Sequence, residues 1–276
     1  AGNSIEDIAA LVRYAHRYRS KVLVALNTVL TDEQLPEVQK LIGQLYEAGA
    51  DALIVQDMGI LQLDLPPMEL HASTQTDNRT VEKVKFLQDV GFSRVVLARE
   101  LTLNQIRNIK KQTDVELECF VHGSLCVSYS GQCYISEAMT GRSANRGECA
   151  QYCRLPYQLT DANGEVLVKN KHLLSLKDLD LSERLKEADY VKNITAYYRQ
   201  KLDTILERRM DVKKASAGKT TFFFEPNPDK SFRRGATDYF LNGRQPNISQ
   251  PETPKSIGEE IGQITYISGQ FIEIKT

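Results

Sequence analysis

The chain has 276 residues, of which 41% are hydrophobic and 26% are charged, and its formal net charge is −1. This composition is typical of an ordinary globular protein, and the length allows about two domains. No apolar run approaches the ~18–20 residues that a membrane-spanning helix needs, and no signal-peptide pattern follows Ala1. We therefore expect a cytoplasmic protein without membrane insertion.

The first half of the chain alternates apolar runs with helical patterns. Apolar residues at helical spacing predict amphipathic helices, and short runs rich in β-branched residues predict strands. The predicted helices are residues 5–18, 31–49, 81–90 and 102–112, and the predicted strands are residues 21–27, 52–56, 69–73, 94–98 and 115–121. This alternation predicts an α/β fold with a parallel sheet, either an open sheet or a TIM-like (β/α) barrel. No Gly-x-Gly-x-x-Gly follows any of these strands, which argues against a dinucleotide-binding fold.

Polar side chains follow several predicted strands at the point where each strand ends. In a (β/α) barrel these carboxyl ends form one ring around a single site, and this favours the barrel. We predict His71, Glu100 and His122 as catalytic residues, although a structural role fits each position equally well. The predicted substrate-binding residues on the same ring are Asn27, Gln56, Asp57, Gln75 and Arg99.

The second half of the chain has a different pattern. Residues 166–171 are predicted to form a short polar connection and residues 188–209 an amphipathic helix. A β-rich tail follows, with an apolar run over residues 220–224 and a hairpin pattern over residues 263–274. We therefore expect an incomplete barrel over residues 1–210, with a cysteine-containing insertion at about 122–160, and a β-rich domain over residues 211–276.

Positive charge is concentrated in part of the chain. Residues 186–244 contain thirteen Lys or Arg and eight Asp or Glu. Such an excess is compatible with contact to RNA, and it is also common on solvated helices. Arg146 and Arg154 lie among the cysteines, where positive charge would stabilise thiolates and attract phosphate, so both are predicted to bind substrate.

All five cysteines lie close together in the sequence. A tight, odd-numbered group in a chain of this size favours metal binding or catalysis over disulfide bonds. Cys119 is predicted to be a buried apolar residue and not a ligand. The other four can hold one metal centre, and their spacing leaves an iron–sulfur cluster, zinc and unliganded thiols open. These four are Cys126, Cys133, Cys149 and Cys153.

Two segments around the cysteines resemble the signature of the U32 peptidase/collagenase family. They are residues 118–136, ECFVHGSLCVSYSGQCYIS, and residues 141–154, GRSANRGECAQYCR. Similar stretches continue at residues 71–75, 96–100, 190–193 and 231–241, so the resemblance covers essentially the whole chain. Within the family, residues 155–157 and 172–178 are most similar to the branch that hydroxylates a cytidine of 23S ribosomal RNA.

The resemblance implies more than the spacing does. It implies a TIM-like barrel, a [4Fe–4S] cluster on the four cysteines, C5 hydroxylation of a cytidine in 23S ribosomal RNA, and a dependence on prephenate. Family members carry a further βαβ unit before the region of Ala1 and a βα unit near Leu185 and Lys186. We therefore expect up to three of the eight strands of such a barrel to be missing, and the full protein to be longer at both ends.

Three alternatives stay open. The first is a peptidase, in which His122 would activate the Cys126 thiol, although neither His-Glu-x-x-His nor Gly-x-Ser-x-Gly is present. The second is hydroxylation of a transfer RNA uridine, which the sister branch of the family performs. The third is a non-enzymatic RNA-binding module with structural zinc. The sequence indicates no partner protein.

Overall fold

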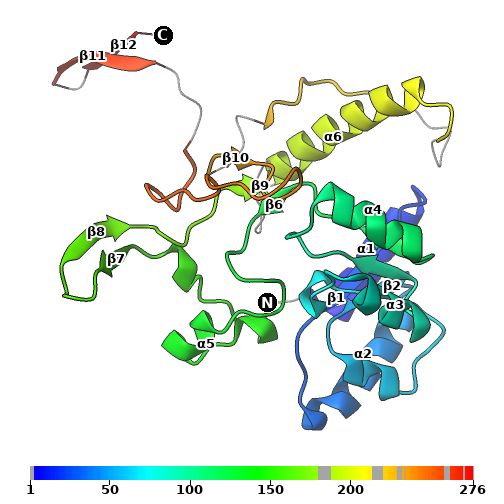
Figure 1. Ribbon diagram of the computed structural model, residues 1–276. Helices are drawn as coiled ribbons and strands as arrows, with labels where there is room; N and C mark the ends of the chain where they lie inside the picture. Colours follow the sequence, from blue (N-terminus) through cyan, green and yellow to red (C-terminus); the bar gives the residue numbers. More distant parts are fainter. Residues whose placement is uncertain are drawn as a thin grey trace. The chain divides into compact units, whose positions relative to one another are not determined.

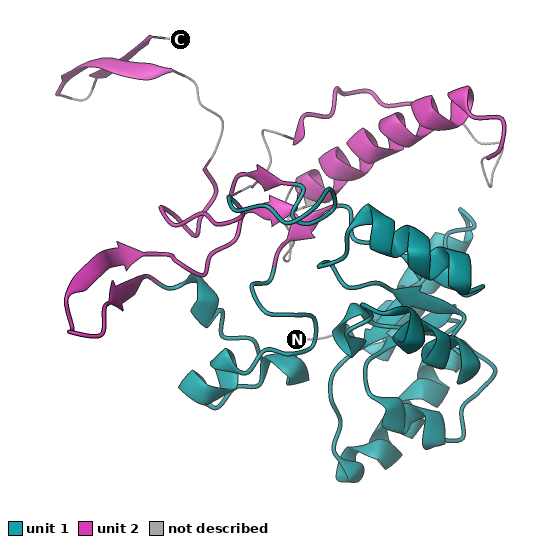
Figure 2. Cartoon of the chain, viewed as in Figure 1, with its two compact units in different colours: residues 1–121, 126–155, 238–247 teal, residues 122–125, 156–237, 248–276 magenta. Residues whose placement is uncertain are grey.

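The computed structural model describes residues 3–179, 188–212, 220–228, 232, 234–257, 262–269 and 271–275. The chain forms two compact units that are interleaved in sequence (Figure 2). The first unit consists of residues 1–121, 126–155 and 238–247, and the second of residues 122–125, 156–237 and 248–276. None of the described helices is long and apolar enough to cross a membrane. The predicted division at residue 210 stays a prediction.

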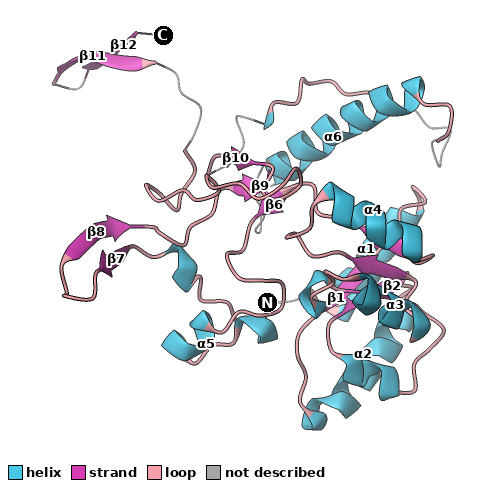
Figure 3. Cartoon of the chain, viewed as in Figure 1, coloured by secondary structure: helices cyan, strands magenta, loops and turns pink. Residues whose placement is uncertain are grey.

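A five-stranded parallel sheet organises the first unit (Figures 1 and 3). Its strands lie side by side in chain order, and every neighbouring pair is parallel. They are β1 (Leu23–Leu26), β2 (Ala52–Val55), β3 (Glu69–Ala72), β4 (Arg94–Val96) and β5 (Glu116–Glu118). Each lies inside a predicted strand, so the α/β fold with a parallel sheet is confirmed. Among the described residues no pairing closes the sheet into a barrel.

Four helices accompany the sheet, and their first turns explain where they begin. Ser4 accepts a hydrogen bond from the backbone N–H of Asp7, whose carboxylate accepts from the backbone N–H of Ser4. Thr102 and Gln105 form the same reciprocal cap. Such capping boxes satisfy N–H groups that a helix leaves unpaired. The helices are α1 (Ile5–His16), α2 (Leu35–Glu47), α3 (Val81–Asp89) and α4 (Leu103–Gln112).

The two faces of the sheet differ in polarity because successive strand residues point to opposite sides. One face forms the hydrophobic core with the helices: Leu53, Val55 and Val95 are completely buried there beside Ile42, Leu45, Leu87 and Ile109. The other face carries charge. Arg94 lies 2.7 Å from Glu116 and 3.4 Å from Glu118 across β4 and β5. Apolar contacts therefore fix the sheet on its helices, and ion pairs link its strands on the other side.

The second unit is built from small sheets and one long helix. Its three-stranded sheet has the order β10 (Ala236–Thr237), β9 (Asp178–Leu179), β6 (Gly123–Ser124). The other described elements are helix α6 (Ala188–Arg208) and the two antiparallel hairpins β7 (Tyr157–Thr160) with β8 (Val166–Lys171) and β11 (Gln263–Ser268) with β12 (Phe271–Lys275). The predicted helix and the predicted C-terminal hairpin are thus confirmed.

Three local predictions are wrong. Residues 166–171 are not a polar connection, because they form β8 and pair with β7. Residues 220–224 form no strand; the rings of Phe222 and Phe224 instead meet edge to face, with centroids 6.0 Å apart. Cys119 is exposed rather than buried, because it follows the last residue of β5. The expected missing βα unit near Leu185 and Lys186 lies outside the described residues.

Candidate functional site

The predicted polar residues of the first unit gather at one edge of the sheet. Asn27 follows β1, Gln56 and Asp57 follow β2, Gln75 lies in the short 3-10 helix η3 (Thr74–Thr76) after β3, and Arg99 and Glu100 come shortly after β4. Because the strands are parallel, their carboxyl ends share this edge. The sequence therefore placed these residues correctly relative to the sheet.

Some of these side chains are used to shape loops. The Asp57 carboxylate accepts hydrogen bonds of 2.8 Å from the backbone N–H groups of Leu30 and Gly59. It therefore ties the loop after β1 to the start of the 3-10 helix η2 (Met58–Gln62). Gln75 and Glu100 accept hydrogen bonds from the backbone of the segment between Cys126 and Cys133.

A cavity of about 330 Å³ lies among the loops at this edge. Its lining includes Gln56, Asp57 and Gln75, which were predicted, and Lys83 and Gln132, which were not. The amide oxygen of Gln56 is buried and has no hydrogen-bond partner among the described residues. A buried acceptor without a donor costs about 1–3 kcal/mol. Gln56 thus combines a buried oxygen without a partner and a place in the lining of the cavity.

His71 lies within β3 and not beyond its end. Its side chain is only 1% exposed, and its Nε2 is 3.4 Å from the Glu69 carboxylate. Burial lowers the pKa of His71, so the ring is neutral at neutral pH. Its Nδ1 is buried without a partner among the described residues. The predicted catalytic role stays a prediction.

His122 belongs to the second unit and lies between two tyrosines. Its Nδ1 is 3.0 Å from the hydroxyl of Tyr198, and its Nε2 is 3.0 Å from the hydroxyl of Tyr190. Burial lowers the pKa of His122 to about 4, so the ring is neutral at neutral pH, with one nitrogen donating and the other accepting. Both nitrogens are therefore used within the second unit, where they hold α6 to residue 122.

The four predicted ligand cysteines all belong to the first unit. Each is a free thiol of intermediate exposure. Burial raises the pKa of Cys153, the adjacent Arg154 opposes this, and the thiols of the other three cysteines raise it further. The four thiols are thus near enough to interact electrostatically. In the described part of the chain, no three His, Cys, Asp or Glu side chains are arranged so that they could hold a metal ion. The cysteines are Cys126, Cys133, Cys149 and Cys153.

The structure places the three predicted arginines in different settings. Arg146 is exposed and donates a hydrogen bond of 3.2 Å to the amide oxygen of Gln34. Arg154 opposes the rise that burial causes in the pKa of Cys153, as positive charge beside a thiol should. Arg99 is half-buried beside Tyr239. Roles of all three in substrate binding stay predictions.

Tyr239 was missed by sequence reasoning. It is 6% exposed, and its ring stacks on Phe240 with centroids 4.1 Å apart. Burial raises the pKa of Tyr239 to about 12; nearby Glu100 adds to this and Arg99 opposes it. Tyr239 lies more than a hundred positions from Arg99 and Glu100 in the sequence. Its only sequence signal was its place in the stretch 231–241, which resembles the family.

The match to known families is extensive. The model of peptidase family U32 matches residues 1–251. The chain belongs to peptidase family U32. This agrees with the resemblance of the cysteine segments and of the strand ends.

Among U32 relatives, the chain is 54% identical to the 23S rRNA 5-hydroxycytidine C2501 synthase of Escherichia coli K12, over 99% of this chain and 45% of that protein. It is 34% identical to the tRNA hydroxylation protein P1 of Bacillus subtilis 168, over 72% of this chain and 54% of that protein. A solved structure of the U32 peptidase Mk0906 aligns with 62% of this chain and 73% of that one, at 14% identity and a TM-score of 0.42. The chain spans about half the length of these curated relatives.

Proposed function

We propose that this chain is part of an RNA-modifying oxidoreductase that hydroxylates C5 of a cytidine in 23S ribosomal RNA. The observation that carries the proposal is the 54% identity to the Escherichia coli 23S rRNA 5-hydroxycytidine synthase across 99% of this chain. That coverage includes nearly every residue of the cavity and of the cysteine loops. A second U32 relative is a tRNA hydroxylation protein, which supports RNA as the class of substrate.

The donor set supports a metal centre. Four free thiols belong to one unit, and the other three contribute to the raised pKa of Cys153. Four thiolates suit a [4Fe–4S] cluster, and they also suit zinc. Cys126, Cys133, Cys149 and Cys153 would hold the group, and a bound cluster would supply one-electron chemistry. Dependence on prephenate remains an implication of the family.

The cavity beside Gln56 supports a flipped base as the bound group. An enzyme that modifies a base atom must take the base out of its stack. About 330 Å³ is at the lower end of the range for small-molecule sites. The unpartnered Gln56 amide oxygen would accept a hydrogen bond from the exocyclic amine of cytosine. Arg146 and Arg154 would contact phosphates.

We infer that the five-stranded sheet is part of a TIM-like barrel. Its strands follow one another in chain order and are all parallel, as in a (β/α) barrel. In a doubly wound sheet the strands are also parallel, but their spatial order reverses at a switch point. The polar residues at the carboxyl ends of β1 to β4 fit the same architecture.

The test uses the full-length protein in its own host. Deletion of the gene should remove 5-hydroxycytidine from 23S ribosomal RNA, as measured by mass spectrometry of nucleosides. The wild-type gene should restore it, and a Cys133→Ser variant that accumulates to the same level should not. Restoration by that variant would contradict a role for the metal centre. Loss of a hydroxylated uridine from transfer RNA instead would move the substrate to the sister branch.

The peptidase alternative has less support from the site. A thiol protease needs a histidine that can take the proton of its cysteine. Both ring nitrogens of His122 are occupied by tyrosine hydroxyls, and its pKa is lowered to about 4. Cleavage of gelatin by the purified, metal-loaded protein, with loss of cleavage after thiol alkylation, would revive this alternative.

A further inference from the structure

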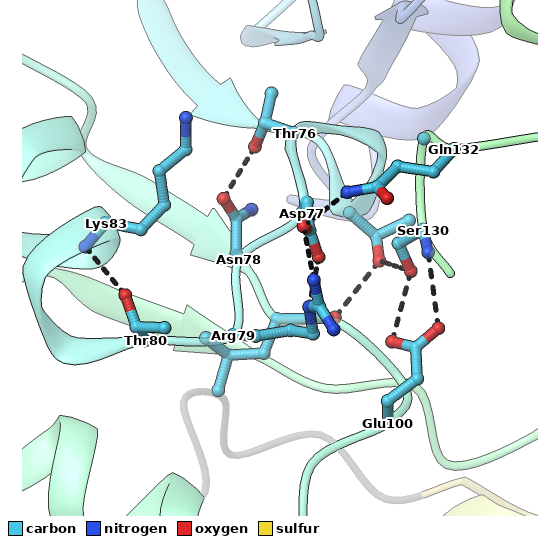
Figure 4. Close-up of polar contacts among 12 residues, drawn as sticks. Thr76, Asp77, Asn78, Arg79, Thr80, Lys83, Glu100, Ser130 and Gln132 are labelled. Atoms are coloured by element: carbon cyan, nitrogen blue, oxygen red, sulfur yellow. Dashed lines mark hydrogen bonds and ion pairs between the residues drawn. The ribbon is translucent and has the colours of Figure 1, made fainter.

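Residues Tyr129 to Gln132, which lie between Cys126 and Cys133, are held against the turn that follows β3. Figure 4 shows Ser130 and Gln132 of this segment facing Glu100 and Asp77. All of these residues belong to the first unit. We call this segment the first cysteine loop.

Glu100 binds the first cysteine loop through Ser130. The backbone N–H of Ser130 donates to Oε1 of Glu100 at 3.2 Å, and the hydroxyl of Ser130 is 3.4 Å from Oε2 (Figure 4). Ser130 is 1% exposed, and the hydroxyl of Thr74 donates to its oxygen at 3.3 Å. The carboxylate thus satisfies a buried backbone donor that water cannot reach, and charge strengthens this kind of hydrogen bond.

Gly131 lies directly against the backbone of Gln75 in the turn after β3. Its N–H donates to the side-chain oxygen of Gln75 at 2.8 Å, and its φ is +75°. A Cβ at this position would lie 1.9 Å from the backbone oxygen of Gln75. Any side chain would therefore force the loop away from the turn after β3. Only glycine fits here, for reasons of both space and conformation.

Two more contacts complete the attachment. The amide of Gln132 donates to Asp77 at 2.8 Å, and Asp77 is also paired with Arg79 at 2.7 Å (Figure 4). The guanidinium of Arg79 lies 4.3 Å from the centre of the Tyr129 ring, a cation–π contact. Every residue of the loop from Tyr129 to Gln132 is thus bound to the turn after β3 or to Glu100. The residue after Gln132 is Cys133.

We propose that Glu100 and Gln75 are positioning residues, which fix the first cysteine loop and so set the place of Cys126 and Cys133. This rests on the proposed metal centre, and it changes the role expected for Glu100 from proton transfer to support. Groups that orient metal ligands are worth about 10–100-fold in metal affinity. This role needs two side-chain hydrogen-bonding positions that face Ser130, and it does not need a carboxylate that transfers a proton.

Glu100→Gln and Glu100→Ala separate the two roles. The glutamine keeps an oxygen for the N–H of Ser130 and adds an amide that can donate to its hydroxyl, whereas alanine removes both contacts. In full-length protein purified without oxygen, iron and sulfide per chain should match wild type in Glu100→Gln and fall about tenfold or more in Glu100→Ala. Loss of iron and sulfide in both variants, or in neither, would overturn the positioning role.

Hydrogen exchange measured in metal-free protein tests this proposal separately from the proposed function. In metal-free protein, hydrogen exchange of the peptide containing Ser130 and Gly131 should become about tenfold faster in Glu100→Ala and stay unchanged in Glu100→Gln. Equal exchange in all three proteins would overturn the proposal. If wild type carries zinc, or no metal, the iron–sulfur assignment fails while this exchange difference still decides the attachment.

A second pair of variants tests the close approach. Gly131→Ala and Gly141→Ala place alanine at similar positive φ, +75° and +71°, but nothing lies within 4 Å of the new Cβ at Gly141. The backbone strain is therefore matched, and only Gly131→Ala collides with Gln75. Gly131→Ala should lose iron and sulfide and show the fast exchange of Glu100→Ala, whereas Gly141→Ala should resemble wild type. Similar behaviour of the two variants would contradict the attachment.

Discussion

Asp178 and Arg234 form a nearly solvent-free ion pair in the second unit. Nη1 of Arg234 donates to Oδ1 of Asp178 at 2.8 Å, and the backbone N–H of Arg234 donates to Oδ2 at 2.7 Å. The Asp178 side chain is 0% exposed and that of Arg234 is 12% exposed. The same guanidinium donates to Ser124 Oγ at 3.1 Å and to the backbone oxygen of Pro254 at 2.8 Å. One side chain thus connects four distant parts of the chain.

We expect Asp178→Ala to lower the free energy of unfolding of the second unit by about 3–5 kcal/mol, because it leaves a buried guanidinium without its counter-charge. Urea denaturation followed by circular dichroism measures this. The matched control is Glu252→Ala, which removes an ion pair with Lys171 whose side chains are 39% and 66% exposed. That variant should lose less than about 1 kcal/mol. Equal losses would contradict the importance of burial.

Stability should depend on pH through His122. Its pKa is lowered to about 4 by burial, whereas an unfolded histidine titrates near 6.5. Between these values the unfolded chain binds a proton that the folded protein does not, so unfolding becomes easier as pH falls from about 6.5 to 4. In His122→Gln the free energy of unfolding should vary less with pH across this window. An unchanged pH dependence in the variant would be the contrary result.

Gln56→Leu should separate binding from stability. Leucine has a similar size and removes the buried amide oxygen that has no partner among the described residues. The free energy of unfolding should therefore stay the same or rise by about 1 kcal/mol, while hydroxylation of RNA by the full-length enzyme should fall. A less stable variant, measured by thermal denaturation, would show that the oxygen is satisfied in the folded protein.

A metal centre predicts selective protection of cysteines from alkylation. Cys119 is exposed, and the other four thiols have intermediate exposure. In metal-loaded protein, iodoacetamide should modify Cys119 alone. After a chelator has removed the metal, iodoacetamide should also modify the other four cysteines. Mass spectrometry of peptides counts the modified residues. Protection that persists unchanged after metal removal would point to burial as its cause.

The sequence predicted the first unit well because its signals are local. Strands such as β2 have apolar residues that face the helices, and caps such as Ser4 lie next to the helices they begin. Strand β8 was missed because both faces of its hairpin are largely open to solvent, so no apolar alternation marks it. Only its pairing with β7 makes it a strand. Conversely, the apolar run at 220–224 has no strand to pair with among the described residues.

The sequence predicted where the candidate residues lie on the sheet, but not what their side chains contact. The residues that follow β1 to β4 share one edge because the strands are parallel. Whether one of these side chains already has a hydrogen-bond partner depends on residues far along the chain. Glu100 accepts a hydrogen bond from Ser130, 30 positions later, and His122 contacts the hydroxyl of Tyr198, 76 positions later. No local pattern encodes such pairs. Asp57, which was predicted to bind substrate, likewise accepts hydrogen bonds from two backbone N–H groups.

The interleaving of the two units has a consequence for synthesis on the ribosome. The first unit holds all the cysteines by residue 155, yet it also includes residues 238–247. Its helix α4 begins with a backbone N–H, that of Leu103, which donates to the carbonyl of Leu241 at 2.9 Å. Because a nascent chain emerges from its N-terminus onward, the cysteines leave the exit tunnel well before the unit that carries them can close. For that interval the thiols are exposed to oxidants and to stray metal ions.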